Sequence, residues 1–499
     1  MLLQTFCTIL TLCAICVSGD CSSVSERITR FAEQLKPKLS ENALISFPGS
    51  DRYANSTARW SVFHAPTFSV AVSVSTEEDV RQTVIVANEN SLPFLAVAGH
   101  HGGINSLGVL NCGVAIDLKG LNRVVVQMGA DTALIEGGAM ARDVNHALWG
   151  YGKWTVTAVC DCVSLLGPAL GGGHGWNQGH YGLAGDQIAE ANLVLGNGSI
   201  IVVSTDSHKD LFWGLRGAGH NFGIVTSVRF KIYDVPDDNS WTVAQYSYTQ
   251  DKLEALFEVL NGFVNDGKQP VELRHWTTLF HNPIVDSVNA SFTTWLIFEG
   301  TEEEAAPYTS QLEAIGPVLA STTPTNYIGL SPLTWNNCSD ASPSDPDNNV
   351  LRFPIDLKSF NITAMREAYE LFNNVTITHP ELNGSTILFE GYSVKGVKEI
   401  PEASTAYPDR FNNLLVAPVI TFASGLPLTE EAQQTGHSLR RILLEGSGST
   451  ELHAYVNYAV GEESFMAWYG YEDWRIKKLK NLKSTYDPAH QFSFYAPIP

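Results

Sequence analysis

The chain has 499 residues, 44% of them hydrophobic and 17% charged, which is enough for a buried core and more than one domain. Its formal net charge of -21 argues against nucleic acid or an anionic membrane surface as a partner, because both would repel it. The partner we expect is a small molecule.

Residues 1–19 are typical of a signal peptide. The apolar run 9–17 is too short to cross a bilayer, and Val17-Ser18-Gly19 offers small residues for cleavage. No later stretch is apolar enough for a transmembrane helix. Seven N-x-[ST] sequons follow, so we expect a secreted or secretory-pathway glycoprotein modified at Asn55, Asn197, Asn289, Asn337, Asn361, Asn374 and Asn383.

Five cysteines remain once this leader is removed: Cys21, Cys112, Cys160, Cys162 and Cys338. An odd number in an oxidising compartment indicates that one thiol has another role. We expect Cys21 to pair with Cys112, whereas the pairing of Cys162 and Cys338 stays open. No further Cys or His pair follows at the spacing of a zinc site, so no metal is expected.

The first ordered unit is predicted to begin near Phe63 as a strand–helix–strand unit. Residues 68–74 alternate as a strand, 76–79 resemble a capping box that begins a helix, and 94–97 form a second strand. The unit ends in the turn Gly99-His100-His101-Gly102-Gly103. Shorter strands are predicted at 114–118, 124–126, 133–135 and 155–159, with a helix at 141–149.

Residues 163–185 contain eight glycines, too many for the interior of a helix. Backbone amides in such turns can bind a pyrophosphate. Neither a P-loop nor a Rossmann fingerprint is present, so the glycines alone fit both a dinucleotide site and a set of tight turns.

The remaining elements change in character near Pro236. Before it we predict a hairpin around Gly196-Asn197-Gly198, a helix at 211–215 and a strand at 224–232. After it come longer alternating segments and amphipathic helices such as 253–264. A basic amphipathic helix at 474–486 is predicted to return to the first domain.

Seven motifs together resemble the vanillyl-alcohol oxidase / p-cresol methylhydroxylase (PCMH) superfamily, and within it the berberine-bridge-enzyme-like oxidoreductases. The five N-terminal motifs resemble its FAD-binding domain, and the other two its substrate domain and C-terminus. They are Gly99-His100-His101-Gly102, Val114-Ala115-Ile116-Asp117-Leu118, Cys160-Asp161-Cys162-Val163 with its glycine run, Tyr181-Gly182-Leu183-Ala184-Gly185-Asp186, Trp213 to Thr226, Thr405-Ala406-Tyr407-Pro408-Asp409-Arg410, and Tyr455-Val456-Asn457-Tyr458.

The resemblance implies an α+β fold. A two-part FAD-binding domain of PCMH type is expected over residues 20–236, and a second α+β substrate domain built on an antiparallel sheet over 237–440. Residues 441–499 are expected to return to the FAD-binding domain.

The resemblance also implies covalently bound FAD, attached through His101 to the 8-methyl carbon and through Cys160 to position 6 of the flavin ring. A neutral imidazole and a thiolate are nucleophiles suited to these bonds. His100 and Cys162 are the alternatives. Further cofactor contacts are implied for Gly99, His100, Gly102, Val163, Gly167, Gly172, Gly173, His174, Ile224 and Asn457.

The family's Asn-Tyr pair implies Tyr458 as the catalytic base, with Asn457 bonded to the cofactor or to the base. Glu390 and His275 are weaker candidates. The chain departs from its relatives on strand 414–420, which lacks their Gln, Glu or Asp, and at Pro168, where a His is common. Ala158 is a small residue at the place where relatives gate oxygen, which favours an oxidase.

We therefore expect an oxidase that passes hydride from a small organic substrate to FAD and then to O2, giving H2O2. The apolar strand 414–420 favours a secondary-metabolite alcohol or an activated C–H. The alternatives are a carbohydrate oxidase of the same family, a flavin-retaining cyclase or isomerase without net redox change, and a non-catalytic glycoprotein.

Overall fold

The computed structural model describes residues 21–338 and 347–499, so the predicted signal peptide lies outside the described residues. Its N-terminal part contains a four-stranded sheet of order β1-β2-β4-β3, parallel apart from β1. The strands are β1 (Leu44–Ser46), β2 (Phe68–Ser73), β3 (Phe94–Val97) and β4 (Gly113–Asp117).

Helix α3 (Glu77–Glu89) joins β2 to β3, and the predicted capping box begins it. The Thr76 hydroxyl accepts from the amide of Asp79, and the Asp79 carboxylate accepts from the amide of Thr76. The prediction that order begins near Phe63 is wrong, because α1 (Ser25–Leu35), β1 and α2 (Asp51–Thr57) precede it. Phe31 and Leu35 of α1 are fully buried in the core of this sheet.

A second, five-stranded antiparallel sheet has the order β5-β6-β10-β8-β9. The predicted hairpin is present between β8 and β9. The elements of this part are β5 (Val124–Val126), β6 (Thr132–Glu136), β8 (Ile188–Val194), β9 (Ile200–Ser204), β10 (Ile224–Lys231), α4 (Ala141–Trp149), α5 (Leu166–Leu170), α6 (Gln178–Tyr181) and α7 (Lys209–Ala218).

The strand predicted at 155–159 is not formed. Strand β7 is limited to Lys153–Trp154 and pairs with β11 (Tyr233–Asp234). Beyond it, side chains bond the backbone in place of a neighbouring strand: Asn177 donates to the carbonyl of Thr155, and Ser331 to that of Val159.

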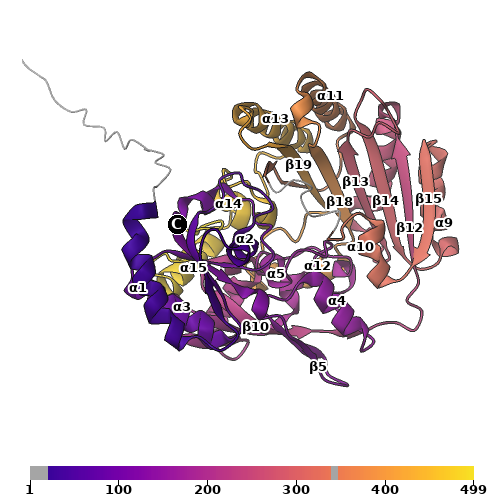
Figure 1. Cartoon of the computed structure of the whole chain (residues 1–499). Coiled ribbons are helices and arrows are strands. Elements are labelled where there is room, and N and C mark those ends of the chain that lie inside the picture. The colour runs from indigo at the N-terminus through magenta and orange to yellow at the C-terminus, as the bar shows by residue number, and fades with distance from the viewer. Residues whose placement is uncertain (1–20, 339–346) are drawn as a thin grey trace, which may run out of the picture.

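Residues after Pro236 form an eight-stranded antiparallel sheet, at the right of Figure 1, with the order β15-β12-β14-β13-β18-β19-β16 and β17 beside β19. The strands are β12 (Trp241–Tyr248), β13 (Leu273–Phe280), β14 (Ser291–Glu299), β15 (Leu319–Thr325), β16 (Asn348–Arg352), β17 (Ile355–Leu357), β18 (Thr386–Tyr392) and β19 (Leu414–Ala423). Short helices α10 (Leu330–Leu333) and α12 (Lys395–Glu399) lie in its connections.

One face of this sheet carries four amphipathic helices: α8 (Leu253–Val264), α9 (Glu302–Ala314), α11 (Ile362–Thr378) and α13 (Thr429–Ser447). Their apolar stripes and the inward residues of the strands form one continuous core. The opposite face packs through a tryptophan-rich cluster against Trp154 and Trp176 of the N-terminal part. Because successive side chains of a strand point to opposite faces of the sheet, only every second side chain can reach that junction.

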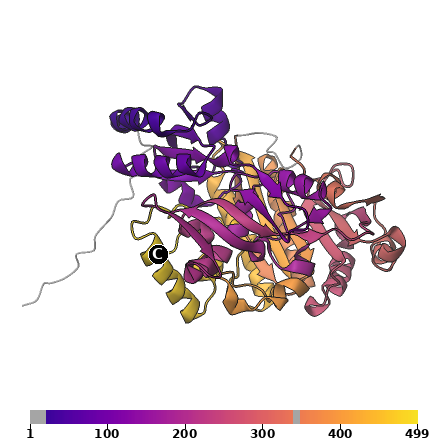
Figure 2. The same ribbon diagram turned by 90° about the horizontal axis from the view of Figure 1, so that it is seen from below.

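The C-terminal segment returns to the N-terminal part, as predicted. Helix α15 (Asp473–Tyr486) buries Leu479 and Leu482 in the same core as Leu215 and Phe222, and α14 (Phe465–Tyr469) joins them. Figures 1 and 2 both show this yellow segment beside the magenta strands. Among residues 21–338 and 347–499, no helix is long and apolar enough to cross a bilayer.

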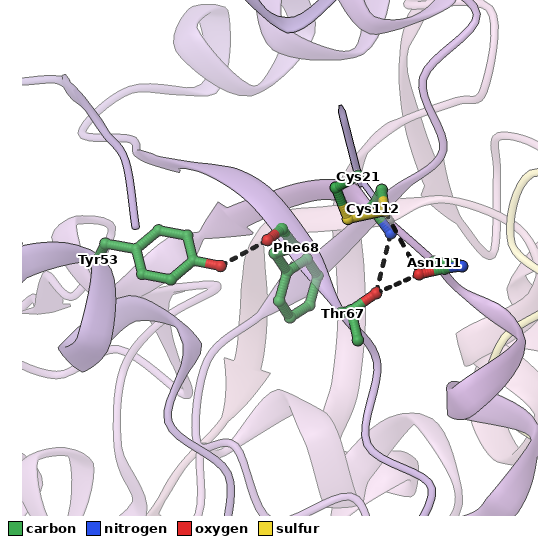
Figure 3. The surroundings of a disulfide bond; sticks show 6 residues. All are labelled: Cys21, Tyr53, Thr67, Phe68, Asn111 and Cys112. Carbon is green, nitrogen blue, oxygen red and sulfur yellow. Dashed lines mark hydrogen bonds between the residues drawn. A yellow bond between two sulfur atoms is a disulfide. The ribbon is translucent and has the colours of Figure 1, made fainter. Parts of the chain in front are cut away.

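Two disulfides connect distant segments. Cys21 is bonded to Cys112 with 5.7 Å between their Cα atoms, the pairing we expected, and ties α1 to the loop before β4 (Figure 3). The amide of Cys112 donates to the hydroxyl of Thr67, which itself donates to Asn111. The second disulfide joins Cys162 to Cys338, which settles the pairing left open above.

Two of the sequence motifs meet in a buried ion pair. Arg410 binds Asp186 in a bidentate manner, with N–O distances of 2.7 and 2.9 Å, and the side chains are only 4% and 3% exposed. A fork of this kind is strong and geometrically specific. It holds the segment before β19 against the glycine-rich segment.

Replacing Arg410 with Ala is expected to lower the free energy of unfolding by about 3–5 kcal/mol, because Asp186 would stay buried without its partner. Chemical denaturation measures this loss. Arg441→Ala is the matched control, since its pair with Glu445 is exposed and the expected change is below about 1 kcal/mol. Equal losses in the two variants would contradict the prediction.

Candidate active site

One cavity of about 840 Å³ lies at the junction between the N-terminal part and the eight-stranded sheet. Its wall combines residues from β3, the loop 98–102, the segment 158–170, strands β13, β14 and β18, and the C-terminal turn Val456–Tyr458 (η12). Of the predicted site residues it includes Gly99, His100, His101, Gly102, Cys160, Val163, Gly167, His174, Ile224, Glu390, Asn457 and Tyr458.

The two histidines after β3 differ in their surroundings. His100 has a left-handed backbone (φ 60°), and its Nδ1 lies 2.5 Å from the carbonyl oxygen of Ala58. The ring of His101 instead stacks on Trp60, with 5.8 Å between ring centroids. Burial, assisted by the charge of Arg352, lowers the pKa of His101 to about 3. His101 therefore presents a neutral, nucleophilic imidazole to the cavity.

Cys160 has the one free thiol among the described cysteines, because Cys162 is bonded to Cys338. Its segment is held on both sides: the amide of Asp161 donates to the carbonyl of Asn336 at 2.9 Å, and that of Ala141 to the carbonyl of Val163 at 2.9 Å. Burial raises the pKa of the thiol, and the backbone amides of Cys162 and Val163 oppose this shift. The disulfide removes Cys162 as the alternative nucleophile.

The close approach of these two segments depends on Gly99. A Cβ atom there would lie 2.6 Å from the amide nitrogen of Ser164. This contact brings the loop of His101 against the turn that follows Cys160. Gly99 thus permits two parts of the protein backbone to pack together, and it also lines the cavity, where its contact with the cofactor stays a prediction.

Gly172 and Gly173 do not line the cavity, so their contact with the cofactor stays a prediction. Both have positive φ, at 111° and 83°, and a Cβ atom would clash with the ring of Tyr407 at Gly172 and with Ala184 at Gly173. Their role is protein packing around the turn.

Asn457 connects the C-terminal turn to the glycine run. Its Nδ2 donates to the carbonyl of Pro168 at 2.8 Å and to the hydroxyl of Tyr455 at 2.7 Å. His174 lies beside Tyr455, with ring centroids 4.7 Å apart, and burial lowers the pKa of its imidazole to about 4. Asn457 and His174 thus position neighbouring groups, and the side chain of neither forms a hydrogen bond with Tyr458.

Tyr458 lies in a buried hydrogen-bond triad with Glu390 at its centre. The hydroxyl of Tyr458 donates to Oε1 of Glu390 at 2.9 Å, and that of Tyr392 donates to Oε2 at 2.6 Å. Burial raises the pKa of Glu390 to about 7, although both hydrogen bonds and Arg352 oppose the shift. A carboxylate with this pKa is suited to accept a proton near neutral pH.

Sequence reasoning missed Arg352, Tyr392 and Trp60. Arg352 stacks on Trp60 at 4.2 Å and on Tyr458 at 4.8 Å from the ring centroids. Arg352 comes from β16, Tyr392 from β18 and Trp60 from the loop between α2 and β2, all outside the recognised motifs, so only the folded chain brings them together near Tyr458.

His275 lies on the wrong face of the sheet to act as the base. It alternates with Arg274 and Trp276 on β13, and its ring contacts Phe263 and Phe360 under the helices. Both ring nitrogens are buried without a hydrogen-bond partner in the described chain. Glu390 faces Trp276 across the β13–β18 pair and therefore points to the cavity.

The wall of the cavity that β13, β14 and β18 form is aromatic. Trp276 stands opposite Trp295 on β14 and opposite Glu390 on β18, so two indoles and the carboxyl form one cross-strand row. Trp335 meets Trp295 edge to face at 4.7 Å. Leu388 of β18 and Thr278 of β13 continue the wall.

Comparison with known proteins identifies the class. A family model described as "FAD binding domain" matches residues 68–204. Physcomitrella patens BBE-like 1 has 20% identity and a TM-score of 0.79, covering 94% of this chain and 99% of that one. A glucooligosaccharide oxidase from Acremonium strictum, with 6-S-cysteinyl, 8α-N1-histidyl FAD, has 18% identity and a TM-score of 0.79, covering 94% and 99%. The predicted fold class is thereby confirmed.

The fold and the matching domain agree with FAD binding, and a curated relative gives the class of protein. The FAD-linked oxidoreductase chyH of Penicillium rubens is 39% identical over 468 residues, which cover 93% of this chain and 93% of that protein. The chain belongs to this family of FAD-linked oxidoreductases, as its motifs predicted.

Proposed function

We propose that the protein is a secreted oxidase with covalently bound FAD, which oxidises a hydrophobic alcohol or an activated C–H and reduces O2 to H2O2. The observation that carries the proposal is the hydrogen bond from Tyr458 to the buried Glu390 in the same cavity as His101 and Cys160. This cavity joins the residues of flavin attachment to a proton acceptor.

His101 and Cys160 fit the attachment of the flavin. One supplies an imidazole that burial keeps neutral, and the other a free thiol where the neighbouring cysteine is already paired. A cavity of about 840 Å³ is in the range expected for cofactor sites. Arg59, whose Nη2 donates to the carbonyl of Gly102 at 2.5 Å, adds a positive charge beside the histidine loop for the cofactor's anionic half.

A flavin held by His101 and Cys160 would supply the acceptor for a hydride from the substrate carbon. Oxidation of an alcohol to a carbonyl leaves a second proton, on the hydroxyl oxygen, which the protein must remove. Tyr458 takes this proton and passes its own phenolic proton to Glu390 through their 2.9 Å hydrogen bond. Tyr392 holds the other oxygen of Glu390, and Asn457 keeps the C-terminal turn in place.

The tryptophan wall supports an apolar, aromatic substrate. Trp276 and Trp295 lie in one cross-strand row with Glu390, so a flat ring on the indoles has its hydroxyl near the base. Among the residues lining the cavity, the one carboxylate is Glu390. Oligosaccharide sites usually offer more polar partners than this wall provides.

Ala158 lines the cavity two residues before Cys160, and its small side chain supports access of O2 to the flavin. Two disulfides support the proposed location of the protein in an oxidising compartment. Five sequon asparagines are exposed and none is buried, which leaves them accessible to glycosylation: Asn55, Asn197, Asn361, Asn374 and Asn383 are exposed, and Asn289 and Asn337 are partly buried.

Anaerobic mixing with candidate substrates tests the reaction. We expect benzylic and terpenoid alcohols to bleach the flavin absorbance, and admitted air to restore it with one H2O2 per flavin. Bleaching by oligosaccharides alone would identify a carbohydrate oxidase instead. Conversion of a substrate with no bleaching and no peroxide would identify a non-redox cyclase or isomerase.

A further inference from the structure

Arg352 is a cation at the substrate end of the cavity that lacks an anionic partner. It belongs to β16, where it stands opposite Val419 of β19, and its side chain lines the cavity. None of the ion pairs formed within residues 21–338 and 347–499 includes it. Its Nε is buried and has no hydrogen-bond acceptor there.

The contacts that Arg352 does make leave its hydrogen bonds unused. The faces of Trp60 and Tyr458 contact its guanidinium at 4.2 and 4.8 Å from the ring centroids. Aromatic faces stabilise the charge but accept no conventional hydrogen bonds from its N–H groups. A guanidinium held flat in this way presents a fixed fork that matches a carboxylate.

The nearest acidic group in the cavity serves another purpose. Glu390 is bonded by both Tyr458 and Tyr392, which occupy its two oxygens. The charge of Arg352 acts on Glu390, His101 and Cys160 without a direct bond to any of them. The cavity of this acidic protein thus contains two cations, Arg59 and Arg352, against one carboxyl.

We propose that Arg352 is a specificity-determining residue that binds a carboxylate of the substrate, so that the preferred substrate is an aromatic hydroxy acid. The inference rests on the proposed function and names its substrate class. The ring lies on Trp276 and Trp295, the hydroxyl meets Tyr458, and the acid group meets the guanidinium. Because Arg352 stacks on Tyr458, the carboxylate lies close to the reacting carbon.

Calorimetric titration of the holoprotein with benzoate and with benzamide tests this site. The two probes share ring and shape, and benzoate alone carries the charge. We expect benzoate to bind roughly 10- to 100-fold more tightly than benzamide, as a charge-assisted bidentate contact predicts. Added salt weakens benzoate binding more than benzamide binding.

Two variants complete the test. In Arg352→Met, which keeps the apolar stem, we expect the benzoate-to-benzamide ratio to fall to about one with benzamide binding unchanged. Arg352→Lys keeps the charge and is expected to retain part of the preference. A wild-type ratio near one, no benzoate binding at millimolar concentration, or an unchanged ratio in Arg352→Met would each overturn the proposal. Calorimetry measures ligand binding and does not depend on the flavin absorbance. A colourless protein would therefore contradict the proposed covalent flavin, whereas the benzoate result by itself tests the carboxylate site.

Discussion

Replacing Glu390 with Gln is expected to slow flavin reduction by substrate roughly 100- to 10,000-fold, the usual contribution of a general base. The amide keeps the shape of the carboxyl but cannot take the proton of Tyr458. Stopped-flow absorbance of the flavin measures the rate. Glu445→Gln, an exposed exchange of the same kind, is the control and should react at the wild-type rate.

The pH dependence gives this prediction a second readout. Because the pKa of Glu390 is about 7, the deprotonated base appears as the pH rises through 7, and kcat/KM is expected to rise with it. Glu390→Gln should lack this step. A wild-type profile that stays flat between pH 6 and 8 would contradict the role of Glu390.

The same group affects stability with the opposite sign. Its pKa is raised on folding, so its contribution to stability is complete below the unfolded pKa and is lost as the pH rises through about 7. The free energy of unfolding of the wild type is therefore expected to fall, relative to that of Glu390→Gln, as the pH is raised from 5 to 8. Thermal unfolding at both pH values distinguishes this effect from general damage to the fold.

Flavin attachment is expected to survive the loss of either bond but not of both. His101→Ala and Cys160→Ala should each leave a yellow pellet after acid precipitation, whereas the double variant should release its flavin to the supernatant. The reason is that, in the proposed attachment, the imidazole and the thiol form independent links to one flavin ring. Mass analysis of the flavin peptide locates each link.

His100→Ala is the matched control for attachment. Its ring is bonded to the carbonyl of Ala58, so its loss should leave both covalent links intact. Release of flavin from the wild type by acid, or a yellow pellet from the double variant, would show that these two residues do not hold the cofactor.

Local patterns in the sequence predicted much of the scaffold. The capping box at Thr76 and the hairpin around Gly196-Asn197-Gly198 depend on contacts between near neighbours, and both are present. The motifs of the flavin segment predicted the family and the fold, because motif recognition does not require knowledge of distant contacts. Strand 155–159 was wrongly predicted because side chains from elsewhere bond that backbone.

The sequence by itself therefore determined the family of FAD-linked oxidoreductases, and it supplied His101 and Cys160 as the residues proposed for flavin attachment. Only the tertiary structure decided which face of β13 and β18 lines the cavity. It placed Glu390 beside Tyr458 and placed His275 under the helices. Only it paired Cys162 with Cys338 and brought Arg352 onto Tyr458. The physical reason is that these contacts join residues far apart along the chain, whose meeting depends on sheet register and strand order.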